Sequence, residues 1–472
     1  MKDKFGDVKE LLERVVADHV LPGVVVAAVV DGELVHAEAC GYRDLEQKLP
    51  VTEDTPSRWY SISKPITAVA WGRLVESGKV KWDTPVKELL PELRFSDPVA
   101  TERATIRDLL LHRTGMVGGG WFWMGEVIPP EVMMERIPHV PCTPGFRAGF
   151  HYQNLNFTIL AEAMKTLGTN WHDAIKETLG VLGVKPLTSL KEFVEADRML
   201  GYGPSGFSPP ERLDDFDFEA CAGASAICGS VKELAQVARM IALGGTVDGN
   251  EVVSESMWKE LVQPVVGAGD PSWPEMCQAS LQLAGHRVAY RGEVLCSWAG
   301  GFSGWTAQIE VLPGRKAAGV ALVNRSASPA SDALGLEMLD RAAGWDALPW
   351  ADRFLEQKRK LRAAGPKKLE ERLARPVGEW PCSTEGVCGS FEHPAYGSFS
   401  VERTGEEVRM RFRHVDLPMQ PREDGTVSVD GSHQDATELM WDLKPIVEGD
   451  EVAAWDFGPD GEPSICRFER KV

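Results

Sequence analysis

Residues 60–75 read YSISKPITAVAWGRLV, a largely apolar run that is typical of a helix buried on most sides. Pro65 is compatible with the first turn of this helix, where backbone N–H groups have no intrahelical partner. Ser61 and Lys64 are three residues apart and therefore lie on one helix face. An amine held beside a serine hydroxyl can accept its proton, which activates a weak nucleophile. The stretch thus predicts a nucleophile and its base at the start of one helix.

Ser-x-x-Lys patterns also occur by chance, where the serine caps a helix and the lysine is solvated, so further stretches are needed to decide. Residues 105–116, TIRDLLLHRTGM, predict a short apolar helix that ends at Gly115 in a left-handed C-cap. His112 in this stretch is either a catalytic base or a buried histidine that braces the turn. The buried, bracing role is favoured.

Two glycine-rich stretches are candidates for lining a cleft. Residues 118–124 read GGGWFWM and predict a loop in which Trp121 and Trp123 line an apolar cleft, with core packing as the alternative. Residues 297–305 read SWAGGFSGW and are followed by two strand-like segments. Glycines allow the backbone to approach a ligand closely, and an exposed strand edge can supply an N–H group to an oxyanion.

A tyrosine and an asparagine lie two residues apart within residues 144–157, PGFRAGFHYQNLNF. In extended backbone, Tyr152 and Asn154 project to the same side. A phenol can relay a proton, and an amide can orient a carbonyl or an amine. The pair is a weak signal alone and gains weight from its place in the chain.

The bulk properties exclude several classes of partner. The formal net charge of −19 argues against nucleic acid and anionic membranes, both of which require a basic face. Residues 1–10 lack the apolar core of a signal peptide, and no apolar run approaches the ~20 residues that span a bilayer. The nine cysteines are scattered without a C-x-x-C pair. These features predict a cytoplasmic protein with reduced thiols.

At 472 residues the chain exceeds what one core usually supports. We expect a catalytic domain at 1–348, which includes a β-hairpin at 23–39 with an Asp-Gly turn. A helical linker at 349–377 is expected to break at Gly365-Pro366. Short alternating strands with Asp-Gly turns predict a small antiparallel β-barrel at 378–472.

The motifs together resemble one known superfamily. They occur in the order Ser61-x-x-Lys64, Leu110-Leu111-His112-x-Thr114-Gly115, Tyr152-x-Asn154 and the glycine-rich strand at 297–305. This order resembles the serine β-lactamase and penicillin-binding-protein superfamily, in particular its class C-like branch of D-aminopeptidases, β-lactamase-fold esterases and penicillin-binding-type thioesterases. The resemblance covers roughly residues 10–345. It implies an α+β fold, in which an antiparallel sheet is flanked by helices and joined by an all-helical subdomain. The tail resembles the lipocalin-like barrels appended to several such peptidases.

The resemblance also implies roles for single residues. Ser61 would be the acylated nucleophile and Lys64 its base or proton shuttle. Tyr152 would work with Lys64 in acylation and deacylation, and Asn154 would position the substrate. No cofactor and no metal is implied, and the sequence has no H-E-x-x-H or phosphate-binding glycine motif.

The third motif departs from the superfamily pattern. It usually begins with His or Lys, and here the matching position is Trp298, followed by Gly300 and Gly301. An indole cannot pair with a substrate carboxylate, which argues against β-lactam or D-Ala-D-Ala carboxypeptidase activity. Some esterases of this fold also carry Trp at this position, and this resemblance favours neutral or bulky acyl donors. The backbone N–H groups of Ser61 and of a residue near Gly300 or Gly301 would form the oxyanion hole.

Three functions follow from this pattern. The first is a serine acyl-enzyme hydrolase or acyltransferase that acts on an amide, ester or thioester of a small-molecule or peptidyl substrate. The second is a penicillin-binding-type thioesterase that releases and macrocyclises a nonribosomal peptide, for which a carrier protein presenting a thioester is the candidate partner. The third is a catalytically silent binding protein, whose signature would be loss of Lys64 or Tyr152.

Overall fold

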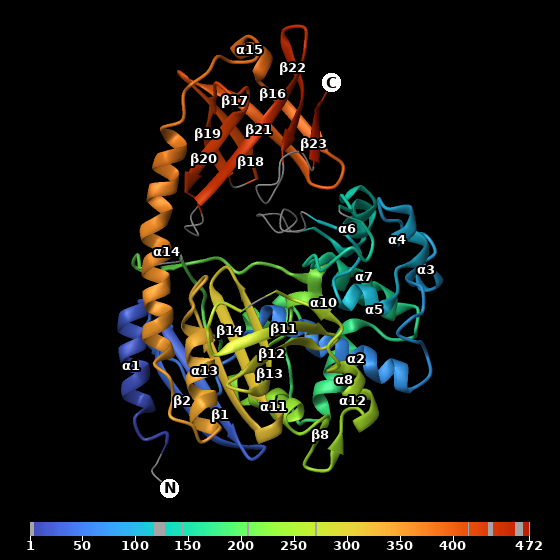
Figure 1. Ribbon diagram of the computed structural model, residues 1–472, viewed down its shortest axis with the longest axis vertical. Helices are drawn as coiled ribbons and strands as arrows, with labels where there is room; N and C mark the ends of the chain where they lie inside the picture. Colours follow the sequence, from blue (N-terminus) through green and yellow to red (C-terminus); the bar gives the residue numbers. More distant parts are fainter. Residues whose placement is uncertain are drawn as a thin grey trace.

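The computed structural model describes residues 4–117, 128–143, 145–204, 207–269, 271–413, 415–432, 438–457 and 466–471. Within these residues, one long antiparallel sheet forms the centre of the larger unit and a closed barrel forms the smaller one (Figure 1). The fold is α+β, as the sequence predicts. No helix in these ranges is both long enough and apolar enough to cross a bilayer.

Nine antiparallel strands of the described chain form the central sheet. In spatial order they are β10 (Val266–Gly267), β11 (Met276–Gln282), β12 (Gly285–Tyr290), β13 (Glu293–Phe302), β14 (Trp305–Leu312), β15 (Ala317–Val323), β1 (Gly23–Val30), β2 (Glu33–Asp44) and β3 (Leu49–Pro50). β1 and β2 are the expected hairpin. The short pairs β4 (Ser57–Arg58) with β7 (Cys228–Gly229), β5 (Tyr202–Gly203) with β6 (Glu211–Arg212), and β8 (Thr246–Val247) with β9 (Asn250–Glu251) lie outside this sheet.

Helices cover both faces of the sheet, which explains why β1 is apolar at nearly every position. Val24, Val26 and Ala28 pack with α1 (Val8–His19) and α13 (Ala330–Ala342). The alternate residues of β1 join a second core with α11 (Val231–Ala242) and α2 (Ser63–Glu76), the helix that begins directly after the Ser61 turn. The sheet therefore holds α2 against one of its faces.

A helical subdomain lies beside the sheet and contributes residues of the expected site (Figure 1). Its helices are α3 (Val86–Leu89), α4 (Pro98–Arg103), α5 (Ile106–Leu110), α6 (Pro130–Arg136), α7 (Leu155–Lys165), α8 (Trp171–Gly180), α9 (Leu190–Glu195), α10 (Ala222–Ser225) and α12 (Glu255–Leu261). The helix α5 begins at a capping box made by Thr105 and Asp108. The left-handed residue directly after its C-cap is His112, with φ of 55°, whereas the sequence pointed to Gly115, which lies three residues further on and also has positive φ.

A single long helix, α14 (Trp350–Leu373), connects the larger unit to the barrel (Figure 1). The expected break at Gly365-Pro366 was wrong, because the helix continues through both residues. Proline removes one helical hydrogen bond, and α14 runs between the two units where water can replace the lost donor. A short helix, α15 (Thr384–Val387), precedes the barrel.

The barrel closes because its first and last strands pair with each other. Its strands are β16 (Gly389–His393), β17 (Gly397–Thr404), β18 (Glu407–Phe412), β19 (Val415–Pro421), β20 (Val427–Ser432), β21 (Glu438–Glu448), β22 (Glu451–Phe457) and β23 (Cys466–Arg470). Alternate apolar residues fill the interior, with Met410, Phe412 and Trp455 fully buried. The predicted antiparallel barrel is confirmed.

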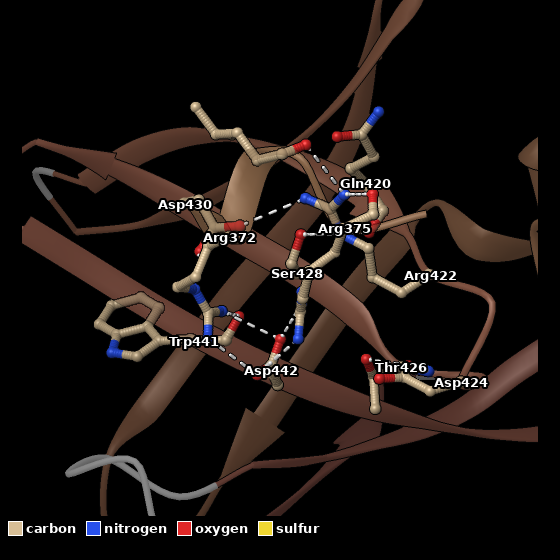
Figure 2. A network of polar contacts seen from close by, with 11 residues as sticks. Arg372, Arg375, Gln420, Arg422, Asp424, Thr426, Ser428, Asp430, Trp441 and Asp442 are labelled. Carbon is tan, nitrogen blue, oxygen red and sulfur yellow. Dashed lines mark hydrogen bonds and ion pairs between the residues drawn. The ribbon is translucent and has the colours of Figure 1, made fainter. Parts of the chain in front are cut away.

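An arginine–aspartate network joins the end of α14 to the barrel wall (Figure 2). Arg372 donates to Asp430 at 2.7 Å and to both carboxylate oxygens of Asp442 at 3.0 Å. Arg375 donates to Asp442 at 2.6 Å. Inside the wall, Arg422 lies 3.5 Å from Asp430, and both side chains are almost fully buried. The barrel is thus attached to α14 by charged hydrogen bonds rather than by a flexible tether.

Candidate active site

Ser61 lies in a 3₁₀ turn (Tyr60–Ile62) that leads directly into α2, rather than in the helix itself. Tyr60 has φ of 47°, a conformation that is uncommon for any residue other than glycine. Its hydroxyl donates to the carbonyl oxygen of Ser303 at 2.7 Å, and its ring packs edge-on against Phe218 at 5.3 Å between centroids. These contacts hold Tyr60 in its strained conformation, which places the next residue, Ser61, at the cleft.

The Ser61 hydroxyl has two hydrogen-bond partners. Lys64 Nζ donates to Ser61 Oγ at 2.9 Å, and Tyr152 Oη shares a hydrogen bond of 2.9 Å with the same oxygen. The structure therefore brings together the three residues that the sequence proposed as catalytic. A serine oxygen held between an amine and a phenol can give its proton to the neutral amine, or to the phenolate that forms when the phenol has passed its own proton to the amine.

Lys64 is almost fully buried, and its surroundings fix the direction of its ammonium group. Nζ donates a second hydrogen bond, of 3.2 Å, to the carbonyl oxygen of Ala224 in α10. It also lies 4.8 Å from the centroid of the Tyr152 ring and 5.5 Å from that of Phe157. Ala224 and Phe157 are not among the site residues that the sequence predicts. The run of small residues at 222–225 was the available signal for α10, because small side chains let its backbone approach α2.

His112 braces Tyr152 and makes no hydrogen bond to Ser61. Its Nδ1 accepts the backbone N–H of Gln153 at 2.9 Å, and its ring stacks on that of Tyr152 at 4.8 Å between centroids. Burial lowers the pKa of His112 well below its usual value, and the charges of Lys64 and His286 lower it further. Burial and the Lys64 charge also lower the pKa of His286. These shifts favour the neutral form of both histidines, which keeps further positive charge away from Lys64.

The third motif contacts the start of α2 through a glycine. A Cβ at Gly300 would lie 2.0 Å from the carbonyl oxygen of Trp59 and 3.0 Å from the backbone nitrogen of Ser61. β13 and the serine turn are thus in direct backbone contact. Trp298, on the same face of β13, is buried, and its indole N–H donates to the carbonyl oxygen of Ala284 at 2.8 Å. It forms part of a cavity wall but presents no free polar group.

Ser61 and Tyr152 lie between two cavities. The larger, of about 710 Å³, is also lined by Lys64, Trp298 and Gly301. The smaller, of about 240 Å³, contains Asn154, whose Oδ1 is buried without a hydrogen-bond partner. An unpaired amide oxygen beside the serine suits the expected role of Asn154 in orienting a donor group of the substrate. Trp121 and Trp123 lie outside the described residues.

Metal-ligating side chains do not gather at this site. Across the described ranges, no three His, Cys, Asp or Glu residues are placed to hold a metal ion. All nine cysteines are free thiols, including Cys382 and Cys388, which are only six residues apart in sequence.

Comparison with known proteins identifies one family model and several relatives that match this chain. A model of the Beta-lactamase family matches residues 8–343. The unguisins hydrolase ungD' of Aspergillus campestris is 24% identical over 97% of this chain and 88% of its own. The D-aminopeptidase of Brucella anthropi is 26% identical over 59% of this chain and 52% of its own.

A more similar relative matches only a short segment. The mitochondrial serine beta-lactamase-like protein LACTB of Homo sapiens is 37% identical over 23% of this chain, and the chain spans only 20% of its length. Among solved structures, the octameric penicillin-binding protein homologue from Pyrococcus abyssi is 20% identical and has a TM-score of 0.63 over 99% of this chain and 100% of its own. That likeness shows a shared fold across both units.

Proposed function

The chain belongs to the beta-lactamase family, and we propose that it is a serine hydrolase in which Ser61 forms an acyl-enzyme with a peptide-like amide, ester or thioester. The observation that carries the proposal is the pair of 2.9 Å hydrogen bonds from Ser61 Oγ to Lys64 and Tyr152. A serine with both partners in place has a route for its proton in each half of the reaction.

In the first half-reaction, Ser61 Oγ attacks the substrate carbonyl carbon and gives its proton to the Lys64–Tyr152 pair. The tetrahedral intermediate then collapses, and the same pair returns the proton to the leaving amine, alcohol or thiol. In the second half-reaction, water attacks the acyl-enzyme and loses a proton to the pair. The proton passes back to Ser61 Oγ as the acid product leaves. The cycle balances without a cofactor.

We assign the oxyanion hole to the backbone N–H groups of Ser61 and Gly301. The close contact between Gly300 and the Ser61 backbone supports this assignment, since it places the backbone of β13 beside the backbone of the Ser61 turn. Donors at that point would stabilise the negative charge that develops on the carbonyl oxygen. Trp298 supplies no charge to the cavity wall, which supports acyl donors that carry no carboxylate at this position.

Hydrolysis is favoured over cyclisation by the exposure of the site. Tyr152 is 48% exposed, so water can reach the acyl-enzyme beside it. The near full-length match to a protein named as a hydrolase agrees with this choice. An acyltransferase or peptide cyclase would instead need an amine to intercept the acyl group before water. A silent binding protein is disfavoured because Lys64 and Tyr152 are both present.

The test is intact-protein mass spectrometry after incubation with activated acyl donors. The panel comprises p-nitrophenyl esters, a D-amino acid amide, a β-lactam and a peptidyl thioester with a free N-terminal amine. We expect an adduct on Ser61 that is absent from Ser61→Ala, and free acid as product. Cyclic product from the thioester would indicate a cyclase instead. Failure of every donor to give an adduct or turnover would contradict the proposal.

A further inference from the structure

The larger cavity does not end at the serine. From Ser61 it passes β13 and reaches the space between the sheet and α13, where Glu310 and Asp332 line it. Successive strand residues face opposite sides, so Ser297 faces α13 whereas Gly300 faces α2. Three residues separate the two positions, which places the far end of the cavity roughly 10 Å along the strand from the serine turn.

The far end is rich in hydrogen-bond acceptors. Glu310 Oε1 accepts from Gln308 Nε2 at 2.6 Å and from Ser297 Oγ at 3.1 Å. Glu310 and Gln308 are each only 3% exposed, and Glu310 Oε2 and Gln308 Oε1 are buried without a partner. Asp332, from α13, accepts from Ser331 Oγ at 3.3 Å. Burying an acceptor without a donor costs free energy, and Gln282 Oε1 in the same lining is unpaired as well, so the cavity wall here has several acceptors that lack a donor.

The charges at this end are also unbalanced. Among the described residues that line the cavity, the basic groups Lys64, His112 and His286 lie near Ser61, and no basic side chain accompanies the two carboxyl groups. Burial raises the pKa of Glu310 to about 8 and that of Asp332 to about 6. The carboxyl groups thus lack the counter-charge that a buried acid normally has.

We propose that this end of the cavity is a subsite for a protonated amine on the acyl donor, with Glu310 and Asp332 as its counter-charges and Gln308 as a further acceptor. An ammonium group supplies three donors to the unpaired oxygens, and its positive charge favours release of the proton that burial otherwise keeps on the carboxyl group of Glu310. The role of the subsite in choosing substrates rests on the proposed function of Ser61. The preferred donor then carries its amine at least roughly 10 Å from the scissile carbonyl, which is the offset along β13 alone.

Binding is tested without catalysis by titrating n-octylammonium chloride into the Ser61→Ala protein in a calorimeter. We expect saturable binding, weakened about ten- to hundred-fold by adding Glu310→Gln, because hydrogen bonds to charged groups are the strong ones. Asp332→Asn is expected to weaken it similarly. The control is Glu251→Gln, which removes an exposed acid from β9. The absence of binding would contradict the subsite. Equal affinity with and without the two subsite substitutions would also contradict it, provided that each variant melts cooperatively.

Substrate preference is tested with matched p-nitrophenyl esters on the Ser61 protein. The ω-aminooctanoyl and nonanoyl esters differ only in an ammonium group in place of a terminal methyl. We expect kcat/KM to favour the amino ester about ten- to hundred-fold, and Glu310→Gln to bring the ratio toward one. If both esters acylate Ser61 equally, the proposed function stands and the subsite falls. If neither ester acylates Ser61 but octylammonium still binds, the subsite stands and the proposed function falls.

Discussion

The hydroxyl oxygens of Ser61 and Tyr152 lie 2.9 Å apart, although 91 residues separate them in the chain. The ring of Tyr152 stacks on that of His112, and Lys64 Nζ lies 4.8 Å from its centroid. A rigid phenol beside a nucleophile is suited to passing a proton without rearrangement.

We predict that Tyr152→Phe lowers kcat/KM for an ester substrate by about 10²- to 10⁴-fold, the usual contribution of a general acid–base group. The ring contacts with His112 and Lys64 remain, so the melting temperature should change little. Steady-state kinetics and a thermal melt measure the two effects. Tyr42→Phe is the matched control, because Tyr42 is an exposed tyrosine in β2. Equal loss in both variants would contradict a specific role for Tyr152.

Lys64→Met is predicted to abolish measurable turnover while the protein still folds. Methionine fills a similar apolar volume but removes the hydrogen bonds to Ser61 and to the Ala224 carbonyl oxygen. Ser61 then lacks its nearest proton acceptor, and the loss should reach at least about 10³-fold. Activity within tenfold of the parent would show that Tyr152 suffices as base. Circular dichroism checks the fold.

Gly300→Ala should damage both stability and activity. The added Cβ would lie 2.0 Å from the Trp59 carbonyl oxygen, so backbone must move, and overpacking of this kind costs about 1–3 kcal/mol. The displaced turn carries Ser61, so acylation should slow as well. Gly267→Ala, on the edge strand β10, is the control, since its Cβ would meet nothing within 4 Å. Paired melts and acylation rates compare the two variants, and equal behaviour would count against this contact.

Asp430→Asn is predicted to destabilise the barrel by about 3–5 kcal/mol. It leaves the almost fully buried Arg422 without its anionic partner and weakens the bond to Arg372 on α14. Asp456→Asn breaks an ion pair whose arginine is largely exposed, and should cost no more than about 1 kcal/mol. Urea unfolding followed by tryptophan fluorescence would detect the difference. Similar losses for the two variants would argue against the buried network.

Glu310 should make stability depend on pH. Its pKa is raised from 4.5 to about 8 in the folded chain, so the folded state keeps a proton that the unfolded state releases. Stability from this group is therefore full below pH 4.5 and decreases as pH rises toward 8. Glu310→Gln removes this pH dependence. The melting temperature of the variant minus that of the parent should therefore increase from pH 5 to pH 8. A constant difference across this window would mean that Glu310 does not titrate there.

Local patterns were sufficient for much of the fold. The apolar run after Lys64, the Asp-Gly hairpin turn and the alternating strands of the barrel all appear in the structure as predicted. The pairing of Ser61 with Lys64 also follows from sequence, because residues three apart are neighbours whether the turn is α-helical or, as here, begins as a 3₁₀ turn. The domain boundaries expected at 348 and 377 stay predictions.

Tertiary packing decided the rest of the site. Nothing in the local sequence brings Tyr152 or the Ala224 carbonyl oxygen to the Ser61–Lys64 turn, since these contacts arise only when α10 and the segment before α7 pack against it. The burial of Trp298 depends on which face of β13 meets α2, and strand periodicity defines two faces without assigning either to the core. The acceptor-rich end of the cavity needs α13 to close over β14. Contacts between residues close in sequence are determined by backbone geometry. Contacts between residues far apart in sequence are determined by the burial of the apolar faces of whole helices and strands.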